Sequence, residues 1–156
     1  MNDIEQLVDM LERAFRRRSW HGANLRGSIR RVTPGEAAWR PRTGRHNIWE
    51  LVAHCAYWKY AARRRLTGEA RGSFAIRGSN WFTRPEQATE TAWRSDLALL
   101  DDQHRALIDA VRRVRPQALH RRLARSADTA FSLIVGVAAH DVYHAGQIQL
   151  LRRLIP

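Results

Sequence analysis

The sequence predicts an all-α protein folded as a four-helix bundle. Four long stretches repeat apolar residues at intervals of three and four, which is the spacing of an amphipathic helix. No alternating apolar and polar residues joined by tight glycine turns occur, so strands are not predicted. The chain has 156 residues, 44% of them apolar, and this suits one domain spanning residues 1–156.

The first long helix is predicted over residues 3–18. Its apolar positions follow helical spacing: Ile4, Leu7, Val8, Leu11 and Phe15. After a less regular stretch, a short helix is predicted to start at Thr33. The run Thr33-Pro34-Gly35-Glu36 combines a capping box with proline at the first helical position. The run Pro41-Arg42-Thr43-Gly44 then interrupts this helix.

The second long helix is predicted to follow Asn47, a capping residue with Glu50 three positions later. Its apolar residues are Ile48, Leu51, Val52, Cys55 and Trp58, and it should end near Gly68. Residues 68–86 contain three glycines, a proline and Trp81-Phe82, and they predict a loop. We expect a loop of this length to cover part of the molecule or to span the length of the bundle.

The third long helix is predicted from Thr89 to Arg115, because Pro116 cannot continue it. The fourth is predicted to start at Asp128 or Thr129 and to run to about Leu154. Its apolar residues again follow helical spacing: Phe131, Ile134, Val135, Ala138, Val142, Ile148 and Leu151.

The chain is strongly basic: 27 Lys and Arg against 15 Asp and Glu give a formal charge of +12. Most of the arginine runs close a predicted helix, where cations complement the negative end of the helix dipole. These runs include Arg16-Arg17-Arg18, Arg63-Arg64-Arg65, Arg112-Arg113 and Arg152-Arg153. No continuous basic stripe with interleaved aromatic residues occurs, so we do not expect nucleic acid as a partner.

Composition also bears on location. The single cysteine, Cys55, excludes an internal disulfide and fits a reducing cytoplasm. The longest apolar stretches are far below the roughly 18–20 residues that cross a bilayer, and acids rather than a basic leader follow Met1. We therefore expect a cytoplasmic protein with no membrane association.

His140 and His144 are the strongest candidates for chemistry. They are four residues apart in the last predicted helix, so both imidazoles lie on one face and can reach the same cation. His54 falls midway along the second long helix, beside apolar positions. Bundles build metal sites from inward side chains on facing helices, and axes ~8–10 Å apart put a third imidazole within reach. The spacing also fits three core histidines that hydrogen-bond to neighbours or line a water-filled gap.

Residues near the pair add detail. Gln147 follows His144 by three positions and can orient a metal-bound water or a ligand. Asp141 and Tyr143 lie on other faces, where either can hold an imidazole from another helix in one tautomer. Cys55 is turned away from His54, so we interpret it as a core residue. Surface or capping roles are predicted for the remaining histidines: His21, His46, His104 and His120.

Two segments resemble a known family. The run from Ala138 to Ile148, with its His-x3-His core, resembles the terminal motif of the DinB/YfiT-like family, and the segment from Trp39 to His54 resembles that family's second-helix motif. The resemblance covers nearly the whole chain. It implies an up-down-down-up four-helix bundle, often a homodimer, with a divalent metal on His54, His140 and His144.

The resemblance also implies a range of activities. Characterised members include metal-dependent transferases that couple low-molecular-weight thiols to electrophiles, and a thiol-dependent isomerase. We therefore expect a divalent-metal-dependent enzyme acting on a small-molecule substrate, with a thiol S-transfer, detoxifying or hydrolytic reaction. Zinc is favoured and nickel also suits imidazole ligands. The alternative is a basic, non-enzymatic binding or stress-response module in which the histidines are structural.

Overall fold

The computed structural model describes residues 2–156. The regular elements in this range are helices joined by loops, and no strand occurs in it. The six α-helices are α1 (Asp3–Phe15), α2 (Leu25–Ser28), α3 (Pro34–Ala38), α4 (Ile48–Thr67), α5 (Glu90–Arg112) and α6 (Ala130–Leu154). A 3-10 turn, η1 (Pro116–Ala118), precedes one isolated antiparallel bridge between Arg122 and Thr129. The predicted all-α class is confirmed.

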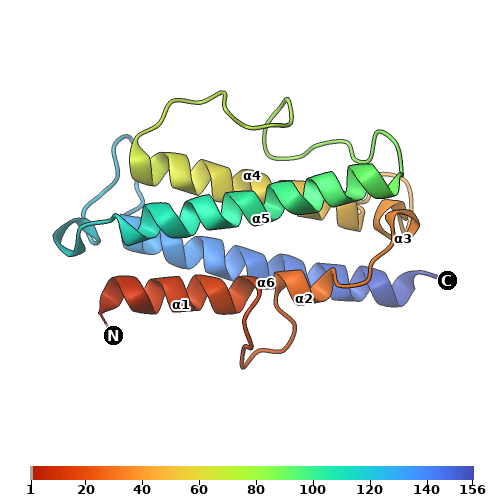
Figure 1. Cartoon of the computed structure of the whole chain (residues 1–156), viewed down its shortest axis with the longest axis horizontal. Coiled ribbons are helices and arrows are strands. Elements are labelled where there is room, and N and C mark those ends of the chain that lie inside the picture. The colour runs from red at the N-terminus through yellow and green to blue at the C-terminus, as the bar shows by residue number, and fades with distance from the viewer. Residues whose placement is uncertain (1) are drawn as a thin grey trace.

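The four long helices lie alongside one another (Figure 1). α4 packs against α5 and α6, and α1 packs against α6 and α5. In Figure 1, α1 and α6 run from left to right, whereas α4 and α5 run from right to left. The loop between α4 and α5 therefore returns along the length of both helices before α5 begins. No helix among residues 2–156 is long and apolar enough to cross a membrane.

Capping residues set the helix starts. The Asn47 side chain accepts a hydrogen bond from the Glu50 amide at 2.7 Å, and Thr129 accepts one from the Ser132 amide at 3.0 Å. At α3 the predicted capping box is complete: Thr33 Oγ1 accepts from the Glu36 amide, and the Glu36 carboxylate accepts from the Thr33 amide. The starts predicted at these three positions are confirmed.

Two helix ends were predicted too late. α1 ends at Phe15 rather than residue 18, because Arg16 leaves helical geometry at φ −147°. α5 ends at Arg112 rather than residue 115, because the next amides bond to carbonyls only three residues back, as in a 3-10 turn, before Pro116. α4 ends as predicted at Gly68, which adopts a left-handed φ of 77°.

The long loop is fastened to the helices near its end. The Arg84 guanidinium donates two hydrogen bonds to the Asp96 carboxylate on α5, at 2.7 and 2.8 Å. The Arg84 carbonyl accepts a bond of 2.8 Å from the Asn47 side chain at the start of α4. Charge-assisted, bidentate contacts of this kind fix the chain in one geometry. They hold the preceding residues, Asn80 and Trp81, against α4.

Candidate metal centre

Three histidine side chains converge between α4 and α6. His140 Nε2 lies 3.1 Å from His54 Nε2 and 3.0 Å from His144 Nε2. One ring nitrogen from each of the three lies within 4.8 Å of the others. His54 and His144 are buried, and His140 is partly exposed. The structure thus brings together the three histidines that sequence spacing and family resemblance singled out.

Oxygen acceptors fix the orientation of two of these imidazoles. His54 Nδ1 lies 2.8 Å from the Asn80 carbonyl oxygen, and His144 Nδ1 lies 2.7 Å from Gln147 Oε1. Because these oxygens only accept hydrogen bonds, each Nδ1 carries the proton of the neutral ring. The Nε2 lone pairs of His54 and His144 therefore both face the centre of the cluster. Metal-binding histidines are usually held by this kind of outer hydrogen bond.

The cluster fits a shared cation better than it fits hydrogen bonding among the rings. Two inward lone pairs face His140 Nε2, which in a neutral ring carries at most one proton and so can satisfy only one of them. Nitrogens bound to one ion at about 2.0–2.1 Å lie about 2.8–3.4 Å apart, for bond angles from 90° to tetrahedral. The 3.0 and 3.1 Å separations fall in that range. His140 differs from its neighbours because its buried Nδ1 has no hydrogen-bond partner among the described residues.

Burial keeps the three rings neutral. It lowers the pKa of His54 from 6.5 to about 4, an effect that the bond to Asn80 opposes and the neighbouring His144 and His46 reinforce. It lowers the pKa of His140 to about 3, with His144, His54 and Lys59 adding to the effect. The pKa of His144 is also lowered, again chiefly by burial. Neutral imidazole is the form that binds a metal ion, so the site is ready for one at neutral pH.

The long loop completes the site. The Trp81 ring stacks on His54 with 3.8 Å between centroids and on His46 with 3.6 Å, so three rings form one stack. The Asn80 side chain accepts a hydrogen bond of 2.9 Å from Trp58 Nε1. Asn80 has a φ of 63°, a left-handed conformation that asparagine tolerates better than most residues. Sequence reasoning predicted a covering loop but not these contacts, because no spacing rule relates residues 80 and 81 to position 54.

The three residues predicted to support His140 and His144 lie in different surroundings: Gln147, Tyr143 and Asp141. Gln147 contacts His144 directly, as described above. Tyr143 is 64% exposed and its ring centroid lies 5.0 Å from that of His144, beside the cluster rather than within it. Asp141 is fully buried, and its carboxylate accepts a hydrogen bond from Lys59 Nζ, so it faces a cation instead of an imidazole.

A second group of ligand-type atoms does not suit a metal. One atom each from Cys55, His140 and Asp141 lie within 4.8 Å of one another. Burial and the nearby Asp141 raise the pKa of the Cys55 thiol well above its usual value, which disfavours the thiolate that would bind a metal. Asp141 is already paired with Lys59. Cys55 belongs to the apolar core, as the sequence predicted.

The surface or capping role predicted for His104 is wrong. His104 is completely buried, and its ring stacks on Phe15 with 3.8 Å between the centroids. The Glu12 carboxylate lies 3.6 Å away, and neither ring nitrogen has a hydrogen-bond partner among residues 2–156. The signal was present in the sequence, because His104 stands between Leu100 and Leu107 at helical spacing. His21 and His120 are exposed. His46 joins the Trp81 stack and bonds to Glu50 at 2.9 Å.

A cavity of about 580 Å³ opens beside the cluster. His144, Gln147 and Trp81 are among the residues that line it. Its lining also includes apolar side chains of α6, among them Leu150, Leu151 and Leu154, and the arginines Arg42 and Arg45. A small molecule with an apolar body and an anionic group fits this combination of surfaces.

Comparison with protein-family models gives one match. The model of the DinB superfamily matches residues 17–148, which contain His54, His140 and His144. Comparison with curated proteins and with solved structures found no match.

Proposed function

The chain belongs to the DinB superfamily, and from this membership we propose that it is a divalent-metal-dependent enzyme whose metal ligands are His54, His140 and His144. One observation carries the proposal: the two fixed tautomers direct the Nε2 lone pairs of His54 and His144 toward His140 Nε2 at 3.0–3.1 Å. Such an arrangement is costly unless a cation fills it.

Three imidazole ligands suit catalysis better than a closed structural site, because structural zinc sites have four protein ligands. A bound divalent ion supplies open coordination positions and lowers the pKa of a thiol or water that occupies one. Zinc is our first choice and nickel the second, since imidazole suits both and no carboxylate of residues 2–156 groups with all three histidines.

This chain's own residues have definable tasks in such a reaction. The Asn80 carbonyl and Gln147 hold the ligand rings in their binding tautomers. Trp81 covers one face of His54 and limits access of water from that side. The adjoining cavity supplies an apolar wall for the electrophile and two arginines, Arg42 and Arg45, for the carboxylates of an anionic thiol. We therefore propose S-transfer from a low-molecular-weight thiol as the reaction.

Metal analysis of protein purified without an affinity tag tests the ligand assignment. We expect about one divalent ion per chain in the wild type and in His120→Ala, and almost none in His54→Ala or His144→Ala. His120 is exposed and packs on Phe131 outside the histidine cluster, which makes it a matched control. Equal, low metal content in all four proteins would show that the assignment is wrong.

Turnover is tested separately. Steady-state assays with a panel of thiols and electrophiles should show activity in metal-loaded wild type and none in His144→Ala. Full metal loading without turnover of any pair would instead favour a metal-holding protein.

The family also suggests an architecture. We propose that residues 1–156 form one up-down-down-up bundle, which the helix directions in Figure 1 support. We further propose a homodimer, since Trp20 is fully exposed and a subunit interface would bury such a ring. Light scattering on the purified protein measures the oligomeric state.

A further inference from the structure

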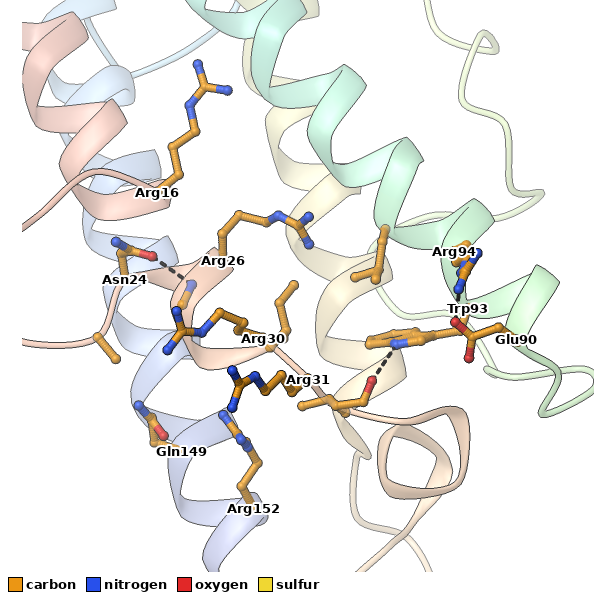
Figure 2. Close-up of a pocket in the computed structure, with 15 residues that line it drawn as sticks. Arg16, Asn24, Arg26, Arg30, Arg31, Glu90, Trp93, Arg94, Gln149 and Arg152 are labelled. Atoms are coloured by element: carbon orange, nitrogen blue, oxygen red, sulfur yellow. Dashed lines mark hydrogen bonds and ion pairs between the residues drawn. The ribbon is translucent and has the colours of Figure 1, made fainter.

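A second cavity lies away from the three clustered histidines, and arginine side chains make up much of its lining. It has a volume of about 1000 Å³ and is bordered by α2, α5 and α6 (Figure 2). Six of its lining residues are arginines: Arg16, Arg26, Arg30, Arg31, Arg94 and Arg152. Glu90 is the one acidic residue among those that line it. None of its lining residues belongs to the histidine cluster or to the cavity beside it.

Half of these arginines are neutralised by carboxylates. Arg16 donates two hydrogen bonds to Glu12, at 2.7 and 2.9 Å. Arg26 lies 3.1 Å from Asp101. Arg94 lies 2.7 Å from Glu90. The other three arginines of the cavity, Arg30, Arg31 and Arg152, take no part in these ion pairs.

Arg30, Arg31 and Arg152 have no ion pair with a carboxylate among the described residues. Arg152 donates one hydrogen bond of 2.8 Å, to the Ser28 carbonyl, and the guanidinium groups of Arg30 and Arg31 have no hydrogen-bond partner in the described chain. Figure 2 shows all three side chains extending into the part of the cavity between α2 and α6. Arg152 also interacts with the Glu36 carboxylate beyond ion-pair distance and adds to the capping-box hydrogen bonds that lower its pKa, so the uncompensated charge comes mainly from Arg30 and Arg31. The remaining positive charge around the cavity is repulsive, and an anion with several charges would relieve that repulsion.

The backbone at Arg31 is consistent with a binding role. Its φ of 62° is left-handed, a conformation that is unfavourable for a long side chain with a Cβ and natural for glycine. The chain therefore keeps an arginine where a glycine would fit with less strain. Strained positions of this kind cluster at ligand-binding sites.

We propose that this cavity binds a small molecule that carries a polyphosphate group. Guanidinium groups bind phosphate oxygens in a bidentate manner, and three of them match the several charges of a polyphosphate. The volume reaches the upper end of the roughly 300–1,000 Å³ typical of small-molecule sites. Ile29, Trp93 and Leu97 supply apolar lining for an attached organic group such as a nucleoside. The site is independent of the proposed metal centre.

The test uses the full chain and two ligands, inorganic tripolyphosphate and ATP, with no added divalent cation. Calorimetry should show that the double variant Arg30→Gln/Arg31→Gly binds tripolyphosphate at least tenfold more weakly than wild type. Glycine suits the backbone at position 31, so the variant should melt no lower than wild type without ligand. The matched control is Arg121→Gln/Arg122→Gln, an exposed adjacent pair in the connector before α6, which should bind within twofold of wild type.

Three results would overturn the proposal that this cavity binds a polyphosphate. If both double variants weaken binding equally, the effect is one of overall charge and the cavity is not the site. If His144→Ala abolishes binding, the anion sits at the histidine cluster and the proposal is wrong. Tighter binding of a duplex oligonucleotide than of tripolyphosphate would overturn it in favour of nucleic acid. Arg30→Gln alone, which removes an exposed and unpartnered side chain, should weaken binding at least threefold and serves if the double variant folds poorly.

Discussion

Two buried regions of the helical interior contain histidine, and they differ in how the ring nitrogens are hydrogen-bonded. At the cluster between α4 and α6, the outer nitrogens of His54 and His144 bond to fixed oxygens and the inner nitrogens meet. Between α1 and α5, His104 stacks on Phe15, and neither of its ring nitrogens has a hydrogen-bond partner in the described part of the chain. Burial lowers the pKa of His104 to about 2, helped by Lys59 and Arg16.

The difference shows that burial and a lowered pKa do not by themselves mark a functional histidine. His104 is more deeply buried than any member of the cluster, yet nothing near it fixes a tautomer or shares a ligand. What distinguishes the cluster is the convergence of three rings, two of which, His54 and His144, are oriented by outer hydrogen bonds. The comparison therefore predicts that replacing a buried polar group with a fixed partner lowers the free energy of unfolding or the metal affinity markedly. Replacing His104 should change the free energy of unfolding little.

Lys59 provides the largest expected effect, because it lies between the two regions. Its ammonium is completely buried, pairs with Asp141 next to His140, and lies 4.8 Å from the centroid of the Phe15 ring under His104. We expect Lys59→Met to lower the free energy of unfolding by about 3–5 kcal/mol at pH 7.5, since it leaves a buried carboxylate without its cation. Denaturant titration measures this loss.

The matched control for Lys59 is Arg65→Met on the same helix. Arg65 is exposed and lies 3.8 Å from Asp128, so its replacement should cost about 0–1 kcal/mol. The double variant Lys59→Met/Asp141→Leu, which removes both charges, should recover most of the loss. A loss below 1 kcal/mol for Lys59→Met would mean that this pair is not part of the fixed polar interior.

Much of this organisation could be predicted from the sequence because it depends on nearby residues. The caps at Thr33, Asn47 and Thr129 act within one turn, and the shared face of His140 and His144 follows from their spacing. The inward position of His54 followed from the apolar residues around it. These features need no knowledge of the tertiary contacts.

Other features depend on contacts between distant segments. Asn80 reaches His54 only because Arg84 fastens the loop to Asp96, and the Lys59–Asp141 pair joins residues on two helices. No local pattern predicts either contact. A single lysine in a chain with 27 basic residues was a compositional signal, but its burial became apparent only from the structure.

Replacing Gln147 tests whether the outer hydrogen bonds of the histidine cluster contribute to metal affinity. Gln147→Leu removes the oxygen that holds His144 Nδ1, and loss of such a partner typically lowers metal affinity 10–100-fold. Competition with a zinc chelator measures the change. Gln149→Leu, two residues further on and lining the arginine cavity instead, should remain within twofold of wild type. Equal affinities for the two variants would show that Gln147 does not orient His144.

The smallest expected effect comes from replacing His104, and it changes how the free energy of unfolding depends on pH. The folded-state pKa is about 2, below the ordinary 6.5, so as the pH falls below about 6.5 the unfolded chain gains a proton that the folded chain does not. Stability is therefore intact above pH 6.5 and is lost at up to about 1.4 kcal/mol per pH unit as the pH falls toward 2. His54 and His140 add to this loss in metal-free protein.

We expect His104→Leu to change the free energy of unfolding by less than about 1 kcal/mol at pH 7.5, because leucine removes two buried nitrogens that have no partner. At pH 5 the variant should be about 1–2 kcal/mol more stable, relative to wild type, than it is at pH 7.5. Denaturant titrations of metal-free protein at both pH values measure the difference, with the exposed His21→Leu expected to follow wild type. A pH dependence unchanged by His104→Leu would mean that His104 takes up its proton in the folded chain at the same pH as in the unfolded chain, and the contrast with the cluster would then fail.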